Sequence, residues 1–172
     1  MRFLCILFCL AGIVGGESVA GMRWTAPPGW KAEAPRPMRA ATYRIAPAAG
    51  DKADAECAIY FFGPGQGGSA EANIERWKNQ VLGADGKPAR AKIGRRTIHG
   101  LPVTTINSSG TYTGMGGPMA ATQTLSRNYR LIGAIVEGPE GNVFLKFAGP
   151  ARTVEQNEPK FERLLNSFAK LK

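Results

Sequence analysis

The order of the expected elements most constrains what this chain can fold into. Strand-like segments come first, an amphipathic helix follows, about four more strand-like segments come next, and a second amphipathic helix lies near the end. A doubly wound parallel sheet needs regular alternation of strands and helices, which this order lacks. We therefore predict an α+β fold, in which an antiparallel sheet of about six strands is packed by two amphipathic helices.

Alternating side chains indicate where the strands lie. The clearest strand is 56–62, whose two faces both become apolar toward its end, as is typical of a central strand covered on both sides. Segments 129–137 and 142–148 are joined by Gly138-Pro139-Glu140-Gly141 and predict a hairpin. In its second strand one face carries only apolar residues, whereas the other carries Lys146. Further strands are expected at 38–45, 91–98, 101–106 and 111–113, with 108–110 as an interruption.

Two apolar stripes predict the helices. Ser69 is a good N-cap for the first helix, which is expected to run to about Leu82. The stripe of the second helix consists of Phe161, Leu164, Leu165, Phe168 and Leu171. Pro159 leaves two alternatives: a long kinked helix from Thr153, or a turn followed by a short helix that begins near the proline.

The first twenty residues have the pattern of a secretory signal peptide. A basic start is followed by about a dozen apolar residues, and Ser18-Val19-Ala20 has the small-x-small pattern of a cleavage site. The apolar run is shorter than the roughly 20 residues of a membrane-spanning helix. We expect residues 1–20 to be removed and 21–172 to form a single domain in the bacterial periplasm or outside the cell, with no transmembrane segment after processing. Cys57 is then the only cysteine, which excludes an internal disulfide.

The charge balance favours an anionic partner. The chain has 22 basic and 13 acidic residues, a net charge of +9. The densest basic segment places Arg90, Lys92 and Arg96 on one face of a strand, with Arg95 on the other. This face is either an anion-binding patch or an edge strand protected by charge. The segment lacks the interleaved aromatic residues of single-strand binders, which disfavours nucleic acid.

A glycine-rich loop precedes the first helix. Gly63, Gly65 and Gly68 match the spacing of a dinucleotide fingerprint, and Ser69 follows at the helix start. The acidic residue that would bind a ribose is misplaced, because Asp85 falls in a turn directly after the helix. An anion or nucleotide bound at the Gly63–Ser69 loop remains an alternative to a plain connector. A second glycine-rich loop is expected at 114–118.

Candidate catalytic residues are few. His99 is the single histidine and precedes Gly100, which is typical of a turn, and the sequence contains no cluster of metal ligands. Cys57 lies on a strand with buried character. A small hydrolase or thiol-dependent enzyme using His99, Cys57 or Ser69 is the enzymatic alternative. We predict no cofactor.

Motifs at both ends of the chain resemble the PsbP-like group. They are Trp24 followed by Pro28-Gly29-Trp30, the segment 144–150 with its final Gly-Pro, and Leu164-Leu165 followed by Ser167-Phe168. The resemblance implies an α/β/α sandwich around an antiparallel sheet, and members of the group are mostly non-enzymatic accessory or binding proteins. The expected function is that of an exported, non-enzymatic accessory or binding module whose partner is an envelope protein or an anionic surface.

Overall fold

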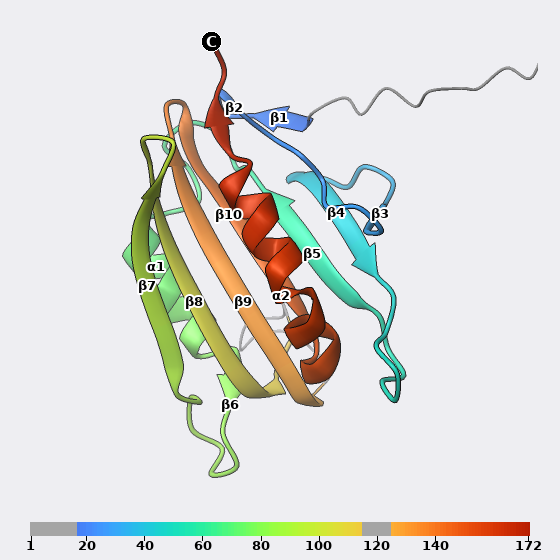
Figure 1. Ribbon diagram of the computed structural model, residues 1–172. Helices are drawn as coiled ribbons and strands as arrows, with labels where there is room; N and C mark the ends of the chain where they lie inside the picture. Colours follow the sequence, from blue (N-terminus) through green and yellow to red (C-terminus); the bar gives the residue numbers. More distant parts are fainter. Residues whose placement is uncertain (1–16, 115–124) are drawn as a thin grey trace, which may run out of the picture.

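A computed structural model describes residues 17–114 and 125–172 and has one large sheet covered on both faces (Figure 1). The order of the large sheet is β3-β4-β5-β10-β9-β8-β6, and β7 pairs with β8 outside this path; every pairing is antiparallel. A second, three-stranded sheet has the order β1-β2-β11. The α+β class and the antiparallel sheet are confirmed, but the described residues form more strands than the six predicted.

The elements have the following bounds. The strands before the first helix are β1 (Glu17–Val19), β2 (Met22–Trp24), β3 (Lys31–Ala32), β4 (Arg39–Ile45) and β5 (Ala55–Tyr60). Helix α1 (Ala70–Lys78) is followed by β6 (Val81–Leu82), β7 (Ala91–Ile98), β8 (Leu101–Tyr112), β9 (Ser126–Gly138) and β10 (Gly141–Pro150). Helix α2 (Ala151–Asn166) and β11 (Ala169–Lys170) end the chain.

The two helices lie on opposite faces of the large sheet, so each face has its own core (Figure 1). On the α2 face, Trp24 stacks on Phe168 at 5.3 Å between ring centroids, and Trp30 lies 5.2 Å from the ring of Phe147. The core on the α1 face includes Ile74, Trp77, Ile106, Leu131, Ile135 and Phe144. Figure 1 shows α1 behind β7 and β8, at one side of the sheet. The core on the α1 face also includes Ala58 and Tyr60 of β5.

Helix α1 ends earlier than predicted, at Lys78. Val81 and Leu82 do not extend its stripe but form β6, which pairs with Thr111 and Tyr112 of β8. The prediction was wrong because buried, apolar residues suit a short strand as well as a helix, and the pairing partner is thirty residues away.

Strand β8 is also longer than predicted, because it continues through 108–110. Ser108 is buried, and its hydroxyl donates a hydrogen bond to the carbonyl of Arg90 (3.3 Å). Gly110 lies so close to β6 that a Cβ there would be 2.2 Å from the carbonyl oxygen of Leu82. The residues that suggested a loop therefore serve the pairing with neighbouring strands.

The C-terminal helix is long and contains Pro159. Of the two alternatives, the structure has a single helix from Ala151 to Asn166. Asn157, two residues before the proline, accepts a hydrogen bond from the indole of Trp30 (3.2 Å). Leu171 is exposed and lies beyond the helix, so its place in the predicted stripe was wrong.

Residues Glu17 to Ala20 form part of the folded unit. Glu17–Val19 pairs with Met22–Trp24 through a two-residue turn, in which Ala20 and Gly21 both have positive φ. The carboxylate of Glu17 accepts hydrogen bonds from the indole of Trp24 (2.9 Å) and from the hydroxyl of Tyr43. Cleavage after Ala20, which stays a prediction, would remove this first strand.

The close approach of α1 to the sheet gives a test of the packing on this face. A Cβ at Gly133 would lie 2.5 Å from the ring of Trp77 and 2.9 Å from Ile106. We expect Gly133→Ala to lower the free energy of unfolding by about 2 kcal/mol, measured by urea denaturation, because the overpacked helix must shift. In a Trp77→Leu background the same substitution should cost less. An equal cost in both backgrounds would show that Trp77 is not what limits the space.

Candidate functional site

The glycine-rich loop before α1 is held by two asparagines. The amide of buried Asn73 donates to the carbonyls of Gly67 (2.8 Å) and Ser69 (2.9 Å), and Asn142 donates to the carbonyl of Gly68 (3.4 Å). Ser69 is the N-cap of α1 as predicted, and its hydroxyl accepts from the amide of Ala72 (3.2 Å). Gly65 has positive φ and open space around it. These hydrogen bonds fix the conformation of the loop that connects β5 to α1. The anion site predicted at Gly65, Gly68 and Ser69 stays a prediction.

His99, Cys57 and Ser69 lie in three different settings. His99 and Gly100 both have positive φ and form the two-residue turn between β7 and β8, and the His99 Nδ1 donates to the carbonyl of Phe168 (2.8 Å). Cys57 is fully buried in the α2-side core, and burial raises the pKa of its thiol well above the ordinary value, which disfavours the reactive thiolate. Ser69 caps α1 on the opposite face. Each residue therefore has a structural role.

The predicted basic strand is β7, at one edge of the large sheet (Figure 1). Its register confirms that Lys92 and Arg96 share the α2 face, whereas Arg95 lies on the α1 face. Arg90 is exposed and directly precedes the strand, outside its bounds. Of the two alternatives for this segment, an edge position is thus observed, and the anion-binding patch stays a prediction.

A polar cluster that the sequence did not reveal surrounds Lys146. Lys146 lies on the α1 face of β10, between Ala58 of β5 and Gly133 of β9, and is 6% exposed. Its amino group donates a hydrogen bond to the side-chain oxygen of Gln80 and lies 5.3 Å from the centroid of the Tyr112 ring. The backbone of Gln80 is itself held in place, because its main-chain carbonyl accepts a hydrogen bond from the backbone amide of Thr113 (3.0 Å). Lys146 therefore lies near the middle of the sheet, in contact with a neutral polar group and an aromatic ring.

Two arginines make the surroundings of Lys146 positive. Burial, together with the nearby guanidinium groups of Arg76 and Arg39, lowers the pKa of Lys146 to about 7, whereas Glu56 opposes them less strongly. Arg39 forms an ion pair with Glu56 (2.9 Å) and lies 5.2 Å from the centroid of the Tyr60 ring. Because the two arginines outweigh the carboxylate at this point, the cluster favours an added negative charge.

Burial also shifts the pKa of the two neighbouring tyrosines. It raises the pKa of Tyr60 and of Tyr112, so both phenols remain protonated hydrogen-bond donors at neutral pH. We use the name Lys146 cluster for Arg39, Glu56, Tyr60, Arg76, Gln80, Tyr112 and Lys146. The one sequence signal that could have found it is a lone lysine in a strand whose other residues are nearly all apolar.

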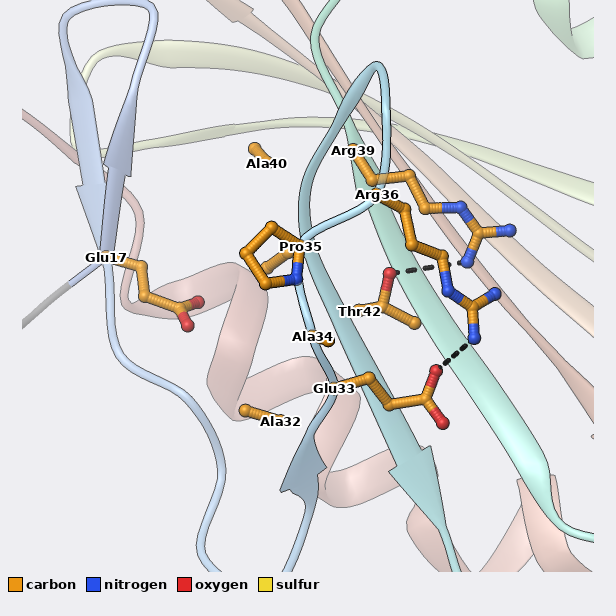
Figure 2. A pocket seen from close by; sticks show the side chains of 10 residues that line it. Glu17, Ala32, Glu33, Ala34, Pro35, Arg36, Arg39, Ala40 and Thr42 are labelled. Atoms are coloured by element: carbon orange, nitrogen blue, oxygen red, sulfur yellow. Dashed lines mark hydrogen bonds and ion pairs between the residues drawn. The ribbon is translucent and has the colours of Figure 1, made fainter.

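A small pocket of about 150 Å³ lies beside the β3–β4 hairpin (Figure 2). Alanines and a proline form much of its lining, and Glu17 borders it on the far side from the two arginines. Arg36 is paired with Glu33 (2.5 Å), and Arg39 donates to the hydroxyl of Thr42 (3.3 Å). The guanidinium groups in Figure 2 point away from Glu17, so this pocket does not gather charged groups around one point.

Residues 17–114 and 125–172 contain neither a cluster of metal ligands nor a helix suited to cross a membrane. No group of three or more histidine, cysteine or acidic side chains there could hold a metal ion. None of the helices in these ranges combines the length and the hydropathy that crossing a membrane requires.

Comparisons with known proteins give similarity of fold only. The sequence matches no protein-family profile and no curated protein. The structure is similar to the solution structure of cyanobacterial PsbP (CyanoP) from Synechocystis sp. PCC 6803, with a TM-score of 0.49, 14% identity, and coverage of 93% of this chain and 98% of that one. It is also similar to PA94 from Pseudomonas aeruginosa, a protein of unknown function, with a TM-score of 0.49, 12% identity, and coverage of 73% and 78%.

The buried lysine gives a test with a defined sign. Between about pH 7 and 10.5 the unfolded chain holds the Lys146 proton more tightly than the folded chain, so stability should rise with pH across this window. We expect Lys146→Met to be more stable than the parent by roughly 2–4 kcal/mol at pH 6. The difference should shrink toward pH 10, as followed by urea denaturation. Lys92→Met, at an exposed lysine, is the control and should leave the pH slope unchanged. If the free energy of unfolding changed with pH equally in the parent and in Lys146→Met, the lysine would titrate in the folded chain as it does in the unfolded one.

Proposed function

We propose that this chain is a non-enzymatic accessory module that binds a small organic anion at the Lys146 cluster. The observation that carries the proposal is the convergence of Lys146, Arg39 and Arg76 on the α1 face of the sheet, beside the rings of Tyr60 and Tyr112. Buried charge is costly, and groups that disturb an otherwise apolar face concentrate at functional sites.

The charge at the cluster supports an anionic ligand. An anion placed near Lys146 would be attracted by the amino group and by the two guanidinium groups, in a region from which water is largely excluded. Lys146 and the phenols of Tyr60 and Tyr112 can donate hydrogen bonds to carboxylate or phosphate oxygens. We propose a carboxylate because this donor set is small.

Aromatic side chains beside the cluster support an organic body on that anion. Tyr60 stacks on Phe62 at 6.0 Å between ring centroids, and Phe62 lies 5.6 Å from the ring of Phe144. Phe62 is partly exposed, which leaves an aromatic surface next to the cations. A flat or apolar group would pack there while its carboxylate points toward Lys146.

Calorimetric titration with benzoate tests this proposal. We expect binding to the parent chain and at least a tenfold weaker affinity in Lys146→Met, because the central cation is lost. Lys92→Met should bind as the parent does. Benzyl alcohol, which has the same ring without the charge, should bind poorly. Benzoate binding that is equal in the parent and Lys146→Met would refute the site.

The pH dependence of benzoate binding has a predicted sign. The bound anion should raise the pKa of Lys146. Binding at pH 8 should therefore be accompanied by proton uptake, whereas binding at pH 6, where the amine is already charged, should take up few protons. The titratable and charged groups that face it are Arg39, Glu56, Tyr60, Arg76 and Tyr112. Titrations in buffers of different ionisation enthalpy measure this uptake. The same affinity at pH 6 and 8 without proton uptake would contradict a role for the amine.

An enzymatic alternative is favoured by the same lysine. An amine with a pKa near 7 is nucleophilic at neutral pH and can condense with a carbonyl compound. Borohydride reduction in the presence of pyruvate would trap such an adduct and raise the mass of the chain. An adduct on Lys146 would replace the non-enzymatic proposal with a Schiff-base enzyme.

We also propose that the chain is exported and that its signal peptide ends before Glu17. Support comes from the first hairpin, in which Glu17 accepts hydrogen bonds from Trp24 and Tyr43 and in which Ala20 is buried. Gly16 supplies a small residue at the last position before this point, and Val14 occupies the third-last. A boundary there retains all of β1, whereas a boundary after Ala20 cuts the turn.

The intact mass of the protein purified from a bacterial envelope fraction checks this boundary. We expect a chain that starts at Glu17. A start at Gly21 would support the boundary after Ala20, and an unprocessed chain confined to the cytoplasm would refute export. Glu17→Gln should be less stable than the parent by about 1 kcal/mol, because a charged acceptor for two buried donors becomes a neutral one.

A further inference from the structure

We propose that the outer edge of β7 docks an extended acidic segment of a partner protein by adding it as a further strand of the large sheet. β7 is eight residues long and pairs with β8 alone among the described strands. This surface is separate from the Lys146 cluster, which lies across β8 and β9 from it.

The turn at His99-Gly100 fixes which backbone groups point outward. In a two-residue hairpin the flanking pair, here Ile98 and Leu101, exchanges hydrogen bonds, and this alternates along the ladder. The hydroxyl of Thr105 donates to the carbonyl of Gly94 (3.5 Å), which agrees with that carbonyl facing β8. The N–H and C=O groups of the intervening residues therefore face away from β8. These residues are Ala91, Ile93, Arg95 and Thr97.

The side chains along this edge are strongly basic. Five of the ten residues 87–96 are lysine or arginine, and none is acidic. Two are paired with the neighbouring helices: Arg95 with Glu71 of α1 (3.5 Å) and Arg96 with Glu162 of α2 (2.6 Å). The others form no ion pair among the described residues; they are Lys87, Arg90 and Lys92. The edge thus keeps an excess of positive charge that an acidic strand would neutralise.

Charge also selects among possible occupants. Two copies of this chain paired edge to edge would place the basic residues of both β7 strands against each other, which is unfavourable. An extended segment with acidic residues at alternate positions would instead place its carboxylates beside Lys92 and Arg96 on the α2 face, while its backbone completes the hydrogen-bond ladder. Ile93, 46% exposed on the other face, offers an apolar contact to the same segment.

A proline substitution separates strand addition from simple charge attraction. Ile93→Pro removes one outward N–H and leaves both the ladder to β8 and all five cations intact. The probe is a synthetic eight-residue peptide of alternating glutamate and valine, measured by fluorescence anisotropy, with a glutamine–valine peptide as its neutral match. We expect Ile93→Pro to weaken binding of the acidic peptide at least tenfold, and Ile93→Ala to weaken it less than threefold. Lys92→Glu should weaken it at least tenfold, and Lys146→Met should leave it unchanged.

The remaining outcomes decide against the proposal. Equal binding to Ile93→Pro and Ile93→Ala, with both variants folded by circular dichroism, would show that the backbone edge is not used. Binding of heparin or of anionic lipid vesicles that is stronger than peptide binding and insensitive to Ile93→Pro would indicate a polyanion or membrane surface. A dimer in sedimentation experiments that Ile93→Pro dissociates would identify a second copy of this chain as the occupant. Equal affinity for the acidic and the neutral peptide would show that the charge of the peptide does not contribute to binding.

Discussion

Antiparallel pairing of β10 between β5 and β9 is the constraint on which the rest of this structure depends. The pairing sends Val143, Leu145 and Phe147 to the α2 face and Phe144 and Lys146 to the α1 face. A shift of one residue would exchange the two sets, placing a lysine in the core under α2. The register therefore keeps the α2-facing side chains of β10 apolar and places its one charged side chain, Lys146, on the other face.

The two faces are covered differently, and this difference places the candidate site. Helix α2 has sixteen residues and closes a core with three contacts between tryptophan and phenylalanine rings around β10 and β2, two of them stacked and one tilted. Helix α1 has nine residues and packs on the β8–β9 side, where Gly133 makes room for Trp77. The Lys146 cluster lies beside this short helix, where β4, β5 and β10 carry charged and aromatic side chains. Because α1 is shorter than α2, charged and aromatic side chains of the sheet can lie beside it on this face.

Local patterns predicted the elements well, and distant pairing explains what they missed. Alternation identified β5, β7 and the β9–β10 hairpin, and His99-Gly100 was recognised as a turn, because those signals lie within a few residues of each other. Val81 and Leu82 were assigned to the helix because their partners on β8 are far along the chain. The second glycine-rich loop, 114–118, lies almost wholly outside the described residues. For Lys146, the sequence predicted the face of the strand but not its neighbours, since Arg39, Arg76 and Gln80 come from three other segments.

The two surfaces proposed for anionic partners differ in how strongly salt should act on them. The side chains of Arg95 and Arg96 at the β7 edge are 70% and 42% exposed, so interactions there lie in a high-dielectric region screened within about 8 Å at physiological ionic strength. Lys146 is buried, and mobile ions reach it poorly, so attraction at that site persists in salt. The net charge of +9 brings acidic molecules toward either surface without distinguishing them. Discrimination must then come from short-range features: backbone groups that accept an extended strand at the edge, and a desolvated amine beside aromatic rings at the centre of the sheet.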